Sequence, residues 1–217
     1  MFGTTKNNLF TNMKNTFLIL LGSLFLIACT ANTLDEIDEA NKATHIDPNV
    51  ANIINTLSQN YSNKTKGLKN KQTLQALINE VEAEAMQDAG FLQLLTAAYT
   101  TPQAMSINAI VTNSDLVLSN LNISATAKNH VITLLNTNSI GNLNNLIQTV
   151  VTDSQLITNE KEMLYEVIDL KRQAVLDNGG DDIWDKKKIV AYIQGATQSK
   201  ANAVLNTVII NVIEKEN

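Results

Sequence analysis

Apolar residues recur at helical spacing along most of the chain after residue 47. Val50, Ile53, Ile54 and Leu57 stand at positions i, i+3, i+4 and i+7, which places them on one face of an α-helix. Comparable spacing continues as far as Ile213. We therefore predict an all-α fold, a single multi-helix bundle of six to eight helices with essentially no sheet. The helices whose limits can be predicted cover about residues 48–60, 114–121, 124–136 and 139–152.

Capping residues and the two prolines predict where helices begin. Asp47-Pro48 and Thr101-Pro102 each place a capping side chain before a proline, whose missing N–H costs nothing in the first turn. Thr158 and either Asp181 or Asp182 are expected to cap the last two long segments, and Gly90 and Gly195 to bend or divide helices. Clusters of Ser, Thr, Asn and Asp at residues 112–116, 137–140 and 152–156 predict tight turns between short helices.

The middle third of the chain is expected to supply much of the core. Two short β-branched runs, Val150-Val151 and Val208-Ile209-Ile210, leave strands as an alternative, although neither run alternates over enough residues to pair convincingly. The predicted core residues of this third are Val117, Leu118, Leu121, Val131, Ile132, Leu134, Leu135, Leu143, Leu146, Ile147, Val150 and Val151.

The longest stretch dominated by apolar residues lies near the start of the chain, at residues 17–29. It reads FLILLGSLFLIAC, follows the positive charge of Lys14 and ends at the only cysteine. The stretch is shorter than the roughly 20 residues that a transmembrane helix needs, and its length is typical of an export signal. We interpret it as a signal peptide, with Met13 as an alternative start that would make residues 1–12 a start-site artefact.

The end of this stretch, Leu26-Ile27-Ala28-Cys29, resembles the lipobox of bacterial lipoproteins. The resemblance implies cleavage between Ala28 and Cys29 and attachment of lipid to the Cys29 sulfur, which would hold the protein on a membrane surface. It also implies a flexible or weakly helical acidic tether. The predicted organisation is therefore a signal peptide at 1–28, the lipidated cysteine and tether at 29–46, and a helical domain at 47–217.

The charge of the mature chain argues against nucleic acid as a partner. Without Lys6 and Lys14 it carries 14 basic and 21 acidic residues, a net charge of −7. Its one dense basic cluster, residues 186–188, directly follows three aspartates, whereas phosphate binding needs basic surfaces. The mature part also carries 25 asparagines, which we attribute to an AT-rich genome. With one cysteine the chain has no disulfide framework.

Neither catalysis nor a cofactor is predicted. The two histidines, His45 and His130, lie in the tether and on an apolar helical segment, where a structural imidazole is the simpler interpretation. No zinc-protease, nucleophile-elbow, phosphate-loop or dinucleotide-binding motif is present. A zinc site would lack ligands of the usual kind, so we expect no metal.

The segment 177–182, with Asp185 a turn later, is the one candidate for a cation. Calcium takes six to eight oxygen ligands on a tight loop, and this segment offers several carboxylates. It departs from the EF-hand because lysines 186–188 stand where a closing glutamate belongs. A turn whose aspartates favour the next helix N-terminus explains the segment more simply.

Trp184 and Tyr192 are a candidate interface. Trp184 is the only tryptophan, and exposed aromatic residues often anchor protein–protein contacts. The alternative is a core tryptophan that closes a corner between helices.

Beyond Cys29, the acidic tether and the asparagine-rich helical domain resemble the surface lipoproteins of Borrelia and related spirochaetes. That resemblance implies a non-catalytic virulence protein, lipid-anchored at the outer membrane or cell surface, that binds a host or vector macromolecule as an adhesin or in immune evasion. Two alternatives remain open: a periplasm-facing lipoprotein with a structural or assembly role, and an enzyme with an unrecognised site. The oligomeric state is open as well.

Overall fold

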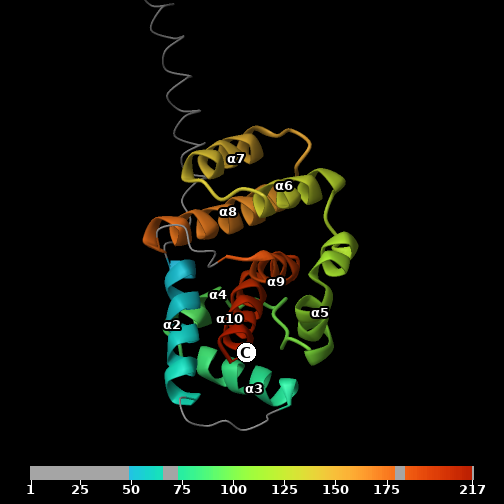
Figure 1. The fold of residues 1–217 in the computed structure, drawn as a ribbon. Helices are drawn as coiled ribbons and strands as arrows, with labels where there is room; N and C mark the ends of the chain where they lie inside the picture. The colour runs from blue at the N-terminus through green and yellow to red at the C-terminus, as the bar shows by residue number, and fades with distance from the viewer. Residues whose placement is uncertain (1–48, 66–72, 179–183, 217) are drawn as a thin grey trace, which may run out of the picture. The chain divides into compact units, whose positions relative to one another are not determined.

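The computed structural model describes residues 49–65, 73–178 and 184–216. Contacts divide the chain between His45 and Ile46, and all described residues belong to the second unit. Within the described ranges the fold contains nine α-helices and no strand, which confirms the all-α prediction (Figure 1). The helices are α2 (Asn49–Thr65), α3 (Leu74–Ala85), α4 (Ala89–Leu94), α5 (Ala104–Asn120), α6 (Ala125–Leu135), α7 (Ile140–Thr152), α8 (Thr158–Asn178), α9 (Lys186–Ala196) and α10 (Lys200–Glu216).

The fold has more helices than the predicted six to eight because the chain also divides at short breaks such as residues 86–88 and 197–199. The turn predicted at residues 112–116 lies inside α5, which is interrupted at Asn113. The two segments that left a strand as an alternative are helical, in α7 and α10. No described helix is long and apolar enough to cross a membrane.

The centre of the fold is α10, which is buried at every position from Ala201 to Ile210. It packs mainly against α9 and α2, with further contacts to α3, α5 and α4 (Figure 1). A helix that is apolar on most of its circumference must be enclosed by other helices.

Gly195 allows α9 and α10 to pack closely. A Cβ at this position would lie 2.4 Å from the backbone of Asn202 and Ala203. The predicted division of the last apolar segment near Gly195 is confirmed, since α9 ends at Ala196 and α10 begins at Lys200. The Ser199 hydroxyl accepts a hydrogen bond from the Asn202 backbone N–H, at 3.1 Å, and thereby caps α10.

Helices α6, α7 and α8 pack on one another. The buried face of α7 consists of Leu143, Leu146, Ile147 and Val150, as predicted. The other predicted core residues of the middle third are also buried or partly buried, except for Ile132. The prediction for Ile132 was wrong, since its side chain is 50% exposed. Helix α6 turns only the face with Ala127, Val131 and Leu134 toward the core.

Two predicted helix starts need correction. We expected Thr101 to cap the helix after Pro102, but α5 begins at Ala104 and its N-cap, Gln103, makes no side-chain hydrogen bond. The Thr101 hydroxyl instead donates to Glu82 Oε1 at 2.7 Å.

The second correction concerns the start of α9, which we placed at Asp181 or Asp182. The helix begins at Lys186, with Asp185 as the N-cap, and the Asp185 carboxylate accepts from the Lys188 N–H at 3.0 Å. Asp181 and Asp182, like Asp47-Pro48, lie outside the described residues.

Candidate functional site

The predicted lipidation and cleavage site, Ala28 and Cys29, lies outside the described residues. The lipid anchor therefore remains a prediction from the sequence.

Trp184 and Tyr192 lie in the core instead of on the surface. Trp184 is 7% exposed and Tyr192 fully buried, and their rings meet edge to face with centroids 6.0 Å apart. The Tyr192 hydroxyl donates to Glu166 Oε2 at 2.8 Å, and burial together with the Glu166 charge raises the pKa of Tyr192 well above its usual value. Glu166 also pairs with Lys200. The Tyr192 hydroxyl joins α9 to α8 through Glu166, and both rings are buried. The core alternative therefore holds, and neither ring presents the exposed surface that an interface requires.

The calcium candidate falls largely outside the described residues, which include only Asp177, Asn178 and Asp185 of it. Asp185 serves as the N-cap of α9. In the part of the chain that the structure describes, no group of three His, Cys, Asp or Glu residues could hold a metal ion.

His130 has the structural environment that its apolar segment predicted. Its Nε2 lies 2.8 Å from Asp153 Oδ2, which links α6 to the residue after α7. This hydrogen bond, and a second from the Gln155 N–H, lower the pKa of Asp153.

The three consecutive lysines at the start of α9 are each paired with a carboxylate. Lys186 Nζ lies 2.9 Å from Asp115 Oδ1, and Lys188 Nζ lies 3.0 Å from Glu214 Oε2. Lys187 Nζ lies 3.9 Å from Glu214 Oε1. Lys188 Nζ also lies 4.0 Å from Asp185 Oδ2, so three carboxylates face the three lysines. The lysine cluster is therefore not a ready anion-binding patch.

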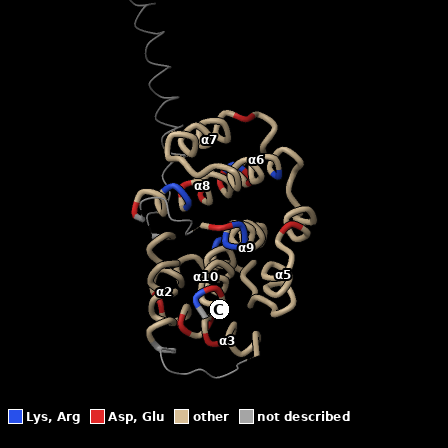
Figure 2. Tube along the Cα trace, in the orientation of Figure 1, with Lys and Arg blue, Asp and Glu red and all other residues tan. Residues whose placement is uncertain are grey.

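The most unusual surface belongs to α5, α6 and α7, whose sequence is almost free of charge. Residues 89–152 contain two charged side chains, Asp115 and Lys128, against 37 in the whole chain. Figure 2 shows the contrast, with the red and blue segments concentrated on α3, α8, α9 and α10. Both charges are used within the fold: Asp115 pairs with Lys186, and Lys128 Nζ donates to the Ser119 carbonyl at 2.8 Å.

Genome composition does not explain this depletion. Residues 89–152 hold ten asparagines and one lysine, whereas residues 153–217 hold six asparagines and seven lysines. The codons of asparagine and lysine begin with the same two adenines, so an AT-rich genome favours both residues. The local loss of lysine therefore has a cause in the protein.

Helix α5 carries exposed, uncharged residues along its length that we call the α5 stripe: Met105, Asn108, Thr112, Leu116 and Ser119. Met105, Asn108 and Thr112 share a face of the first half of α5, and Leu116 and Ser119 share a face of the second half, beyond the break at Asn113. Met105 is 78% exposed and Leu116 is 56% exposed. Exposed apolar side chains among neutral polar ones are typical of the centre of a protein interface, where charged residues are depleted.

The hydroxyl groups of the α5 stripe already have hydrogen-bond partners. Thr112 Oγ1 donates to the Asn108 carbonyl at 2.8 Å, and Ser119 Oγ donates to the Leu116 carbonyl at 2.8 Å. A partner that covered the stripe would leave neither donor unpaired, which lowers the cost of desolvation. Asn113 also interrupts α5 within the stripe, with φ of −154° and ψ of 71°, and its side chain caps the second half by accepting from the Leu116 N–H.

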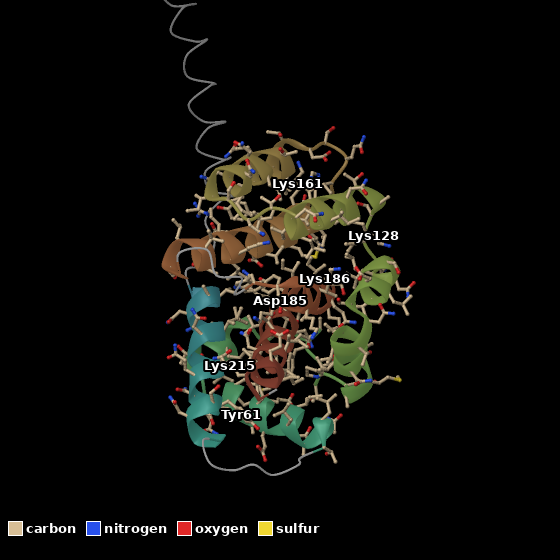
Figure 3. All side chains as sticks on the ribbon, in the orientation of Figure 1. Tyr61, Lys128, Lys161, Asp185, Lys186 and Lys215 are labelled. Carbon is tan, nitrogen blue, oxygen red and sulfur yellow. The ribbon has the colours of Figure 1, made fainter. Side chains whose placement is uncertain are left out.

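Lysines from neighbouring helices bind carbonyl groups at the ends of α5, α6 and α7, and two of them, Lys128 and Lys161, are labelled in Figure 3. No basic residue lies in the last turn of these three helices, where a cation would offset the partial negative charge of the helix end. That cation comes instead from elsewhere in the chain: Lys128 donates to the Ser119 carbonyl, Lys161 to the Val151 carbonyl and Lys171 to the Leu134 carbonyl.

The α5 stripe was not predicted from the sequence, although part of its signal is present there. A count of charged residues along the chain finds the depleted segment. A count of charged residues cannot reveal that Met105 and Leu116 are exposed, because both residues fit the apolar positions of a helix.

Comparison with known proteins does not assign the chain to a family. No protein-family model matches the chain, and no significant similarity to a curated protein or a solved structure was found.

Proposed function

We propose that this protein is a lipid-anchored surface lipoprotein that binds a host or vector macromolecule through the α5 stripe, as an adhesin or in immune evasion. The anchor would be Cys29, supported by the lipobox at residues 26–29. The observation that carries the binding role is the α5 stripe itself, an exposed apolar and neutral face inside a charge-depleted segment.

The chemistry of the stripe favours a macromolecular partner over a small substrate. Met105 and Leu116 lie on the two halves of α5, on either side of the break at Asn113, so only an extended partner surface could cover both. Large apolar side chains surrounded by neutral groups that exclude water can supply much of the binding energy of such a contact.

The same chemistry disfavours a highly charged partner. The one acidic residue beside the stripe, Asp115, is occupied by Lys186, and the exposed residues of the stripe offer amide, hydroxyl and apolar groups. A protein surface of low charge fits this face best.

Adherence of cells that produce the protein to cultured host cells would test the binding role. Leu116→Lys places a charge in the middle of the stripe and should reduce adherence by about tenfold, because a buried unpaired charge costs more than 1.4 kcal/mol. Met86→Lys is the matched control, since Met86 is also an exposed apolar residue, at 36%, but lies at the end of α3. Equal adherence of the parent chain and Leu116→Lys would contradict the proposal.

A further inference from the structure

Met105 is the most exposed large apolar residue in the part of the chain that the structure describes, at 78%. The helical domain has two other methionines. Met86 is 36% exposed, and Met163 is 7% exposed and belongs to the core. A reagent dissolved in water therefore reaches the Met105 sulfur far more easily than the Met163 sulfur.

The reaction that such exposure allows is the transfer of one oxygen atom from hydrogen peroxide to the thioether. A lone pair of the methionine sulfur forms the S–O bond while the O–O bond of the peroxide breaks. The sulfur loses two electrons, and the departing hydroxide takes the proton of the transferred oxygen and leaves as water. The product is methionine sulfoxide, which sulfoxide reductases convert back to the thioether with electrons from thiols.

Oxidation of Met105 would change the chemistry of the α5 stripe. A thioether is apolar and flexible, whereas a sulfoxide is polar and carries a strong hydrogen-bond acceptor. A partner that covers the stripe through apolar contacts would bury this new oxygen without a donor, which opposes binding. The fold would not change, because the exposed Met105 side chain contributes little to the core.

We propose that Met105 is an oxidation switch on the α5 stripe: hydrogen peroxide converts it to the sulfoxide before the other two methionines, and the sulfoxide weakens binding through the stripe. The loss of binding rests on the proposed function. The order in which the methionines react does not depend on that function, because it follows from their exposure alone.

Mass spectrometry of the full chain measures the order of oxidation after brief treatment of producing cells with hydrogen peroxide. In proportion to the exposed fractions, Met105 should react about twice as fast as Met86 and about tenfold faster than Met163. The thermal unfolding temperature should not fall while only Met105 is oxidised. Oxidation of Met86 or Met163 before Met105 would overturn the assignment.

Adherence of the same treated cells to cultured host cells measures the effect on binding. In Met86→Leu, Met105 is the one exposed methionine left in the helical domain, so adherence should fall by about tenfold as its sulfoxide forms. A methionine sulfoxide reductase supplied with a thiol should restore adherence. In Met105→Leu, peroxide should not change adherence relative to the untreated cells of that variant.

Two results would overturn the switch: unchanged adherence after Met105 is oxidised, or an equal fall in Met105→Leu. Leu116→Lys separates this failure from a failure of the proposed function. If the α5 stripe does not bind a partner, Leu116→Lys leaves the adherence of untreated cells unchanged. If the stripe binds but Met105 is not a switch, Leu116→Lys lowers adherence and oxidation of Met105 does not.

Discussion

Glu160, in the first turn of α8, closes the N-terminus of α6 by binding Ser124, the residue that caps it. Glu160 Oε1 accepts from the Ser124 backbone N–H at 2.6 Å, and Oε2 accepts from the Ser124 hydroxyl at 3.1 Å. The Ser124 oxygen in turn accepts from the Ala127 N–H at 3.0 Å. This arrangement resembles a capping box, except that the glutamate comes from another helix, 36 residues later in the chain.

The two hydrogen bonds from Ser124 to Glu160 should contribute to the stability of the fold. Glu160 is 8% exposed, so Glu160→Gln replaces a buried charge-assisted acceptor with a neutral amide. We expect the free energy of unfolding to fall by about 1–3 kcal/mol, measured with urea. Glu162→Gln, at an exposed position on the same helix, should change it by less than about 0.5 kcal/mol. Equal effects of the two substitutions would show that Glu160 contributes no more than a surface glutamate.

Two glycine-to-alanine substitutions should have opposite effects on stability. Gly195→Ala places a Cβ 2.4 Å from the backbone of α10, which cannot move aside without separating α9 from α10. We expect a loss of about 3 kcal/mol or more. Gly141→Ala meets no atom and should raise stability by about 0.5–1 kcal/mol, because alanine favours a helix. Urea unfolding measures both, and a stable Gly195→Ala variant would contradict the close packing of α9 on α10.

Glu214 should make stability depend on pH. Burial and the neighbouring Asp185 raise the pKa of Glu214 above 4.5, although Lys188 opposes them. A carboxyl group with a raised pKa binds more protons in the folded state, so its contribution to stability falls as the pH rises from about 4.5 through the raised value. Glu214→Gln should flatten the pH dependence in this range, which urea unfolding at a series of pH values measures. The same slope in both proteins would rule out Glu214 as its source.

The anchoring residue can be tested by metabolic labelling. Cells producing the parent chain should incorporate labelled palmitate into it, whereas Cys29→Ala removes the only sulfur that could carry a lipid. Labelling should disappear in the variant while the protein remains detectable with an antibody. Persistent labelling would show that the lipid is attached elsewhere.

Much of the fold could be predicted because its helix boundaries are local. Asn113, Ser124 and Ser139 each cap a helix within the next three residues, and the sequence places such residues before apolar segments. The all-α class and the limits of α6 and α7 followed from these signals and from helical spacing.

The predicted helix starts were wrong where contacts with residues distant in the sequence determine the structure. The Thr101 hydroxyl binds Glu82, 19 residues away, and so does not cap α5. Several aspartates could have opened α9, and Asp185 does so, directly after the buried Trp184. The lysines that close α5, α6 and α7 likewise act from outside the last turn of the helix they cap, which no local pattern predicts.

The candidate site was predictable only in part for the same reason. Charge depletion over residues 89–152 is visible in the sequence, but it does not reveal which side of α5 faces water. Ile132 and Val131 are adjacent apolar residues of one helix, and only the packing of α6 makes the first exposed and the second buried.

Protease treatment of intact cells tests the central claim, a lipid-anchored domain at the cell surface, most directly. A periplasmic protein serves as the control for an intact envelope. We predict that the helical domain at 47–217 is lost while the periplasmic control survives. Full protection of the domain, in cells whose permeabilisation then exposes it to the same protease, would contradict a surface location and favour a role inside the envelope.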